Sequence, residues 1–521
     1  MTRFSSVLCW IVLLIFTSVF ILPDISVDAA TADSEPASAE EVSDDFQEND
    51  NSLSGFSEEA DDKSGFSDEA FTDVVDLDQI SASSDEERLL TWGGFIKEDL
   101  GYSYDHEPTY PEISKIRTIL NLKASLRLLS DWRAEAVWNG FYDAAYRNFG
   151  RDKFTEETLD AYESESEIRD LFIDGSVFRW LRFKLGRQII AWGQSETQQI
   201  TDVANPRDNR ELGMVDIEDA RMPVLATKIS LLADAWEVNL VAIHENRPNK
   251  IPTVGSEFDP LVRLRNQFTI RDEEIPENSA ENTEYLVRVF KTFNGGDLGL
   301  VWADVYDDSF YLDFYSYDAI QNRLSLTPRH QRTKTVGFSG NLVRSSWLFK
   351  TEFARKTGVA IARNQTNLTQ QILNAALLAQ MTGTAYFPRE TQIIKTWSQK
   401  NLLQYMLGFE YSGLDDITIS LEGDIEKIED HDDTLGSKET NGSVTLRCDY
   451  TALNDTFNAT VLWFHLTDSN GDVYRINLGY DLIDALNISG GIILYEASKT
   501  DAQVYPYRKN DRLFAALKYS F

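Results

Sequence analysis

The chain has 521 residues and a net charge of -36, with 85 acidic side chains against 49 basic ones. A protein this acidic is poorly suited to bind nucleic acid through phosphate neutralisation. Cys9 lies in the leader and Cys448 stands alone after it, which excludes a disulfide within the mature chain and a cysteine metal site. The histidines show no metal-binding spacing, so we expect neither a metal nor a cofactor.

The first residues have the pattern of a secretory signal peptide. Arg3 precedes an apolar run over residues 7–22, and the small side chain of Ala29 permits cleavage nearby. We therefore expect residues 1–29 to be removed on export. The alternative is an uncleaved anchor, although the run is shorter than the roughly 20 apolar residues of a spanning helix.

Residues 30–88 differ in composition from the rest of the chain. From residue 31 on they contain 20 Asp and Glu residues against Lys63 and Arg88, a net charge of -18. So few apolar side chains cannot offset the entropy of ordering, and we expect a disordered periplasmic segment. A Ser-Gly-Phe-Ser sequence starts at Ser54 and again at Ser64. It suits either a docking motif for a periplasmic protein or a solvated linker.

In residues 89–521, apolar and polar side chains alternate, which is the pattern of strands with one apolar face. Short connections such as Ser130-Asp131 alternate with long ones, among them 309–330 and 358–397. We count about 18 strands, within a range of about 16 to 18, each near the length that a tilted strand needs to cross a bilayer.

The polar faces of these strands carry many ionisable groups, which a dry sandwich core would not tolerate. In lipid, a closed barrel pairs every backbone group and turns its polar face towards a hydrated lumen. The sequence therefore predicts an all-β transmembrane barrel in the bacterial outer membrane, with short periplasmic turns and long outer loops. The side chains expected to line its lumen are Arg127, Arg133, Glu135, Lys228, Arg288, Lys350, Glu352, Glu422, Asp424, Glu426, Arg447, Asp449, Arg475 and Lys518.

A long polar loop separates two predicted strands near 181–188 and 224–232. Alternation places Gln188 in the lumen and Arg187 on the lipid side, unless Gly186 forms a bulge or Arg187 lies at the rim. The loop either folds into the lumen as a constriction or is a solvated outer loop. The residues expected in the constriction are Gln188, Arg207, Asp208, Arg210, Asp216, Glu218, Asp219 and Arg221.

Residues 364–380 break the alternation. Leu368, Ile372, Ala375 and Ala379 recur at spacings of three and four residues, which predicts a helix. The helix is expected either to pack on the barrel rim or to plug the mouth, and packing is the favoured arrangement.

The chain closes with apolar residues at every second position, from Leu513 to Phe521. A terminal Phe in this pattern resembles the assembly signal of bacterial outer-membrane barrels. The resemblance implies that the barrel-assembly machinery recognises Phe521.

Three motifs between Arg179 and Pro223 carry a family resemblance: Gly-Arg-Gln-Ile-Ile-Ala-Trp-Gly from Gly186, Asn-Pro-Arg-Asp from Asn205, and Asp-Ala-Arg-Met-Pro from Asp219. The sequence there resembles an uncharacterised family of Gram-negative outer-membrane barrels of the DUF1302 type, distantly similar to substrate-selective porins. The likeness is local. It implies a barrel with a transport-like role and names no solute.

Three classes of function remain open. The first is a pore for passive or substrate-selective passage of small solutes. The second is a barrel scaffold that docks a periplasmic partner through residues 31–88. The third, an enzyme, is not expected: His465 shares the outward face of its strand with Trp463, and Ser469 lies too far along to pair with it.

Overall fold

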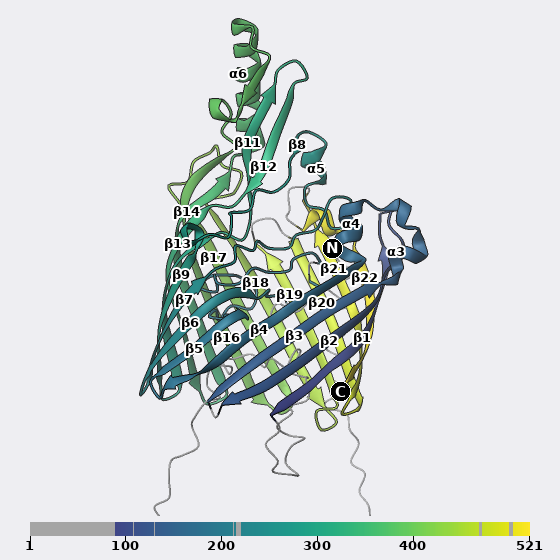
Figure 1. Ribbon diagram of the computed structural model, residues 1–521. Coiled ribbons are helices and arrows are strands. Elements are labelled where there is room, and N and C mark those ends of the chain that lie inside the picture. Colours follow the sequence, from purple (N-terminus) through teal and green to yellow (C-terminus); the bar gives the residue numbers. More distant parts are fainter. Residues whose placement is uncertain are drawn as a thin grey trace, which may run out of the picture. The chain divides into compact units, whose positions relative to one another are not determined.

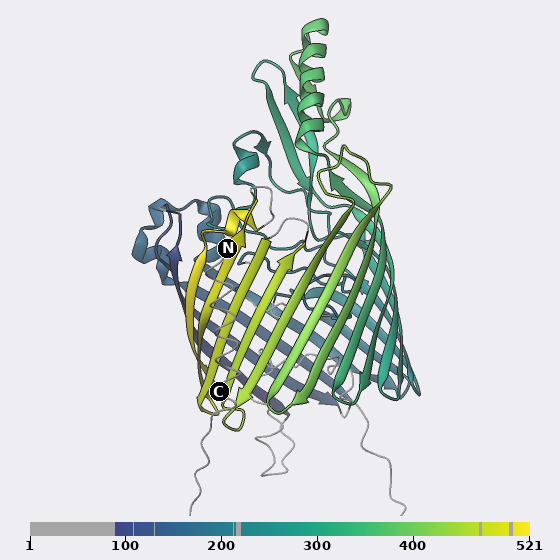
Figure 2. The ribbon, with the colours of Figure 1, turned by 180° about the vertical axis from the view of Figure 1, so that it is seen from behind.

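The computed structural model describes residues 89–107, 109–129, 131–211, 213–214, 220–467, 471–499 and 504–521. Within them, 18 strands form one antiparallel sheet that closes into a barrel (Figures 1 and 2). The predicted signal peptide and acidic segment lie outside the described residues. The barrel strands are β1 (Leu90–Asp105), β2 (Ile113–Leu129), β3 (Trp132–Asp143), β4 (Ser164–Phe178), β5 (Leu181–Gln188), β6 (Val224–Ala233), β7 (Trp236–Ile243), β9 (Glu284–Phe293), β10 (Gly296–Tyr306), β13 (Arg332–Arg344), β14 (Trp347–Ala362), β16 (Trp397–Leu414), β17 (Ile417–Glu429), β18 (Thr440–Ala452), β19 (Phe457–Leu466), β20 (Gly471–Ile483), β21 (Leu486–Ala497) and β22 (Asp511–Ser520).

The two faces of the barrel wall follow from the alternation in sequence. In β17, Leu421 and Ile425 are exposed, whereas Ser420, Glu422 and Asp424 are buried on the opposite face. The same alternation runs through the neighbouring strands, so the outer face is apolar and the inner face polar. The predicted transmembrane barrel and its polarity are therefore confirmed.

Antiparallel pairing of the first and last strands closes the barrel. β1 pairs with β2 on one side and with β22 on the other. Beyond the end of β22, Gly94 and Phe521 exchange both backbone hydrogen bonds, at 3.0 and 2.9 Å. The wall therefore has no free strand edge, as a membrane barrel requires.

The connections at the two ends of the barrel differ in length. At one end the turns are tight; β6 and β7, for example, are separated by Asp234 and Ala235 alone. At the other end, β5 and β6 are separated by residues 189–223. Bacterial barrels place the short turns in the periplasm and the long loops outside, which orients the chain in the membrane.

Aromatic side chains gather at the short-turn end. Trp347 and Tyr411 have ring centroids 4.6 Å apart, and Phe178 and Trp180 have theirs 5.4 Å apart. Trp347 flanks the turn between β13 and β14, Tyr411 the turn between β16 and β17, and Phe178 and Trp180 the turn between β4 and β5. Amphipathic rings at this level suit the boundary between hydrocarbon and headgroups.

The long connections contain structure of their own. A second sheet has the strand order β15 (Tyr386–Pro388), β11 (Tyr311–Asp318), β12 (Arg323–Arg329) and β8 (Thr269–Ile270). Figure 1 shows β11 and β12 extending beyond the long-loop end of the barrel. The remaining elements are α3 (Ala144–Phe149), the 3₁₀ turn η2 (Arg151–Lys153), α4 (Glu156–Tyr162), α5 (Val262–Arg265), η3 (Ala280–Asn282), α6 (Gln365–Thr382), η4 (Arg389–Thr391) and η5 (Tyr505–Tyr507).

Helix α6 confirms the helix predicted at 364–380, but the expected packing was wrong. Its N-cap Asn364 accepts a hydrogen bond from the N–H of Asn367 at 2.8 Å, and Gly383 ends it with φ +71°. Its buried residues Ala375 and Ala379 contact the second sheet. The helix therefore neither packs on the rim nor plugs the mouth, because the predicted 309–330 loop supplies two strands that cover its apolar face. None of the described helices is long and apolar enough to cross a membrane.

Candidate functional site: a lumenal segment and an outer strap

The connection from β5 to β6, residues 189–223, is called the inner segment below. It runs against the inner face of the barrel, where Glu352 of β14 holds it. The Glu352 carboxylate accepts hydrogen bonds from the N–H groups of Gln194 and, at 3.0 Å, of Ser195, and from the N–H and hydroxyl of Thr201, both at 3.0 Å. Four donors converge on one buried carboxylate, so Glu352 positions the backbone of the segment.

Glu422 of β17 holds the same segment from a second strand. It accepts hydrogen bonds from the Ser195 hydroxyl, from the N–H of Glu196 at 3.1 Å and from the Thr197 hydroxyl at 3.2 Å. Glu352 and Glu422 are both buried. Both belong to the predicted lining residues, and each satisfies backbone donors that burial would otherwise leave unpaired.

The segment is braced internally by a buried ionic cluster. Asp202 accepts a hydrogen bond from Nε of Arg221 at 2.8 Å and lies 3.8 Å from Nη2 of Arg207. It also accepts from the N–H of Trp192 at 3.3 Å. Burial is the largest single influence on the Asp202 carboxyl and raises its pKa. The Arg221 and Arg207 guanidiniums together outweigh burial, so the pKa is lowered. Of these residues, Arg207 and Arg221 were predicted and Asp202 was not.

Asn205 joins the two ends of the segment. Its side-chain oxygen accepts from the N–H of Ile190 at 2.7 Å, and its amide nitrogen donates to the carbonyl of Met222, also at 2.7 Å. Asn205 is fully buried. The motif residues Trp192, Asn205, Arg207, Arg221 and Met222 therefore contribute to the internal framework of the segment.

Gln188 marks the point where the chain leaves the wall. It is 1% exposed and donates to the carbonyl of Ala226 at 3.0 Å. The register of β5 with both neighbouring strands continues through Gly186 without a shift, so the predicted bulge is absent. Arg187 lies at the outer end of β5, where Glu245 pairs with it at 2.7 Å, in agreement with the alternative of a rim position.

The predicted constriction residues Asp208 and Arg210 belong to the second half of the inner segment and do not contact Asp202. Arg210 pairs with Asp208 at 2.5 Å and with Glu165, at the outer end of β4, at 2.6 Å. Its neighbour Glu211 pairs with Arg117 of β2 at 2.8 Å. These pairs attach the second half of the segment to the β2–β4 wall. The other predicted residues, Asp216, Glu218 and Asp219, lie outside the described residues.

Glu196 occupies a mixed charge environment that the sequence did not reveal. Its carboxylate accepts from the Ser420 hydroxyl at 3.0 Å and lies 3.8 Å from Nζ of Lys350 and 4.0 Å from Arg447. Burial raises the pKa of Glu196 to about 7, because neither cation is close enough to replace the lost hydration and Glu422 adds repulsion. No sequence signal distinguishes Glu196 from other acidic loop residues.

The remaining predicted lining residues fall into two chemical groups. Several make polar contacts: Arg133 with Asp174, Glu135 with Lys123, Asp424 with Ser443, Glu426 with Gln404, and Arg447 with Asp449. Others place a cation over a ring: Arg288 on Phe290, Arg475 on Phe514 and Lys518 on Phe95. Arg127 is exposed near the end of β2.

Lys228 directly faces another cation. Its cross-strand partner on β5 is Lys184. The Lys184 ammonium lies 3.8 Å from the centroid of the Phe172 ring. Like charges that face each other across a sheet repel, so this pair lowers the stability of the barrel wall locally.

A second long connection, residues 244–283, is called the outer strap below. It leaves β7 and returns to the adjacent β9, yet it contacts the far side of the barrel, beyond β1 to β6. Glu257 pairs there with Arg512 of β22 at 2.9 Å, and Thr155 donates to the carbonyl of Val254 at 2.6 Å. Phe258 is 1% exposed in a cluster with Val473 and Ile493. The strap therefore crosses the mouth of the barrel above the inner segment.

The polar cluster at His465 faces outward. Asp472 accepts a hydrogen bond from Nε1 of Trp463 at 2.9 Å and lies 2.8 Å from Nδ1 of His465. Ser469 lies outside the described residues. Among the described residues, no group of three or more His, Cys, Asp or Glu side chains is arranged to hold a metal ion.

Solved barrels of similar fold include outer-membrane proteins of two organisms. Acinetobacter baumannii OccAB3 aligns with a TM-score of 0.47 and 10% identity over 83% of this chain and 99% of its own. OccAB4 of the same organism aligns with a TM-score of 0.46 and 9% identity, over 83% of this chain and 98% of its own. The outer membrane protein OpdK of Pseudomonas aeruginosa aligns with a TM-score of 0.45 and 9% identity, also over 83% of this chain and 98% of its own. These likenesses concern the fold alone.

No match was found among curated proteins. A family model described as a protein of unknown function, DUF1302, matches residues 102–521. The match extends far beyond the local likeness between Arg179 and Pro223 and covers most of the barrel. The chain therefore belongs to the DUF1302 family.

Proposed function

We propose that the protein is a porin-like pore through which small solutes cross the outer membrane, and that the inner segment forms its constriction. The observation that carries the proposal is the attachment of this segment to Glu352 and Glu422, on strands far from its own. A solvated outer loop would not be tied to the inner wall in this way.

The charged inner face supports passage of polar solutes in preference to apolar ones. We assign the predicted lining residues to the wall of the lumen, including Arg288, Arg475 and Lys518. Subtracting the charges of residues 31–88 and of the leader, -18 and -1, leaves -17 on the barrel region. We therefore propose a weak preference for cations.

Planar-bilayer conductance of the purified, refolded protein tests the proposal. A variant in which a short Gly-Ser linker replaces residues 193–222 is the comparison. We expect steady conductance from the natural chain and larger conductance from the variant. If neither the natural chain nor the variant conducts although both are folded, the proposed pore is contradicted. If the two conduct equally, the proposed constriction is contradicted. A reversal potential on the anion side contradicts the proposed cation preference.

The alternative function is a scaffold that docks a periplasmic partner through residues 31–88. This segment lies outside the described residues, so the alternative stays a prediction. A pull-down that compares the full chain with one lacking residues 31–88 tests it, and an unchanged set of partners contradicts it. Neither proposal assigns a reaction to the protein.

A further inference from the structure

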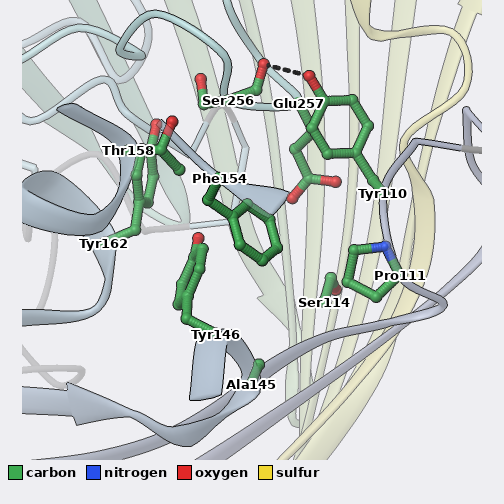
Figure 3. A pocket seen from close by; sticks show the side chains of 10 residues that line it. All are labelled: Tyr110, Pro111, Ser114, Ala145, Tyr146, Phe154, Thr158, Tyr162, Ser256 and Glu257. Carbon is green, nitrogen blue, oxygen red and sulfur yellow. Dashed lines mark hydrogen bonds between the residues drawn. The ribbon is translucent and has the colours of Figure 1, made fainter. Parts of the chain in front are cut away.

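A cavity lies among the outer loops, away from the inner segment (Figure 3). Its aromatic walls are Tyr110 from the β1–β2 connection, Tyr146 of α3, Phe154, and Tyr162 of α4. The outer strap contributes the carboxylate of Glu257, which lies between Tyr110 and Phe154 in Figure 3. The cavity is small, about 30 Å³ in volume, and is partly open to solvent.

The rings form a corner. The centroids of Tyr146 and Phe154 are 4.8 Å apart, and their planes meet at 69°. Tyr162 stands on a third side. A sugar ring stacks best on one flat aromatic platform, whereas a compact group can contact several rings that meet at an angle. The shape therefore favours a rounded ligand of a few heavy atoms.

Three of the hydroxyl groups that line the cavity hold the loops together, whereas the buried Ser114 hydroxyl makes no hydrogen bond within the described residues. Tyr110 donates to the carbonyl of Ser256 at 2.9 Å, Tyr162 to that of Arg210 at 3.1 Å, and Thr158 to a strap carbonyl at 2.9 Å. A ligand rich in hydroxyl groups would have to compete for them. A ligand that needs no hydrogen bonds does not have to displace these three contacts.

Negative charge surrounds the rings. Oε2 of Glu257 pairs with Arg512, but Asp259 and Glu107 also lie near Tyr110. Burial first, and then these three carboxylates, raise the pKa of Tyr110 to about 12. At Tyr146 burial raises the pKa, and the largest charge influence is the guanidinium of Arg117, which lowers it, followed by Glu257, which raises it. On the Tyr110 side of the cavity, the carboxylates of Glu257, Asp259 and Glu107 therefore favour a cation over an anion.

We infer that this cavity binds the head group of an organic cation of the quaternary ammonium class. Such a head group is compact and donates no hydrogen bonds. It is attracted to ring faces by their quadrupole and to Glu257 by its charge. None of the residues that line the cavity belongs to the inner segment, although Tyr162 donates a hydrogen bond to the carbonyl of Arg210. Binding of the cation and passage of solutes can therefore be tested separately.

Ligand-observed NMR on the purified full chain in detergent tests the inference with three probes. Choline carries the charge, 3,3-dimethylbutan-1-ol has nearly the same shape without it, and methyl glucoside represents a saccharide. We expect choline to bind at least about tenfold more tightly than its uncharged analogue, which is the scale of a partly desolvated cation–π contact. Equal binding of the analogue, preferential binding of the glucoside, or no binding of choline overturns the inference.

Variants locate the binding within the cavity. Phe154→Leu removes a ring and should weaken choline binding about tenfold, whereas Tyr146→Phe keeps the ring and should leave it unchanged. Glu257→Gln removes the charge and gives a second, independent loss. Tyr311→Leu, in the second sheet, is the control. Folding of each variant is checked by its heat-dependent gel mobility. Choline binding that survives both Phe154→Leu and Glu257→Gln in folded protein also overturns the inference.

Discussion

Thr201 and Glu352 are 151 residues apart in sequence and are joined by two hydrogen bonds to one oxygen. The N–H and the hydroxyl of Thr201 both donate to Oε2 of Glu352 at 3.0 Å. Oε1 of the same carboxylate accepts a hydrogen bond from the N–H of Ser195 at 3.0 Å. A single side chain of β14 therefore fixes two separate points of the inner segment against the wall.

Replacing Glu352 with Gln should loosen the inner segment. The amide keeps one acceptor oxygen and presents an NH₂ group to backbone donors that need acceptors, which we expect to weaken the attachment by about 3 kcal/mol. Single-channel recording should show larger or more variable conductance. The matched control is Glu135→Gln, because Glu135 lies on β3 beside Lys123 and does not touch the segment. Equal effects of the two substitutions would contradict a specific attachment.

The ionic cluster at Asp202 should be sensitive to loss of its charge. Asp202→Asn leaves the buried guanidiniums of Arg207 and Arg221 without their carboxylate, a change that costs about 3 kcal/mol for buried pairs. We expect the segment to become accessible to added protease while the barrel stays folded. Asp208→Asn serves for comparison, because the Asp208 side chain is 27% exposed and pairs with Arg210 instead of the cluster. Equal protease resistance of Asp202→Asn and the natural chain would contradict the role of the cluster.

Glu196 should make the pore dependent on pH. The pKa of Glu196 is raised to about 7, above the ordinary value of 4.5. The Glu196 carboxyl therefore binds its proton more tightly when the inner segment is attached to the wall than when the segment is released. The attachment is therefore strongest below pH 4.5 and weakens as the pH rises through 7. Ionisation also adds a negative charge to the lumen, so cation preference should grow over the same range. Recordings from pH 5 to pH 8 test both effects, and Glu196→Gln should abolish them.

The facing pair Lys184 and Lys228 should matter more for ion preference than for stability. Changing both to Met removes the repulsion across the pair and should raise the free energy of unfolding by about 0.5 kcal/mol. It also removes two positive charges from the inner face, so the reversal potential should move towards cations. Lys400→Met, at the outer rim beside Asp432, is the control. A shift of the same size in the control would contradict a lumenal origin.

Phe258 should hold the outer strap across the mouth. Phe258→Ala removes a fully buried ring and should cost about 3 to 4 kcal/mol in the packing of the strap on β20 and β21. We expect faster hydrogen exchange in residues 244–283, with little change in the barrel strands. The exposed Val262→Ala provides the comparison. Unchanged exchange in the strap would show that its other contacts suffice.

The barrel could be predicted from the sequence because its signal is local. Alternation in stretches such as 417–429 defines both faces, and Glu422 and Asp424 fall on the predicted inner face. The packing of α6 could not be predicted in this way. Its partners come from 311–318, 323–329 and 386–388, and nothing local shows that these short strands pair with one another.

The inner segment was predicted only in outline. Arg207 and Arg221 meet at a common carboxylate, but the sequence does not show that this is Asp202. Arg210 carries the same charge and binds the β4 wall instead. Composition identifies charged residues, while their partners depend on how the loop folds within a barrel whose curvature is set by distant strands.

The attachment of the inner segment also imposes an order on barrel assembly. The segment follows β5, but the carboxylates that satisfy its backbone belong to β14 and β17, which emerge much later from the ribosome and the export machinery. Its N–H groups must remain with water or a chaperone until those strands have entered the sheet. We therefore expect the proposed narrowing of the lumen to form late in biogenesis, and an assembly intermediate halted before β14 to lack the constriction.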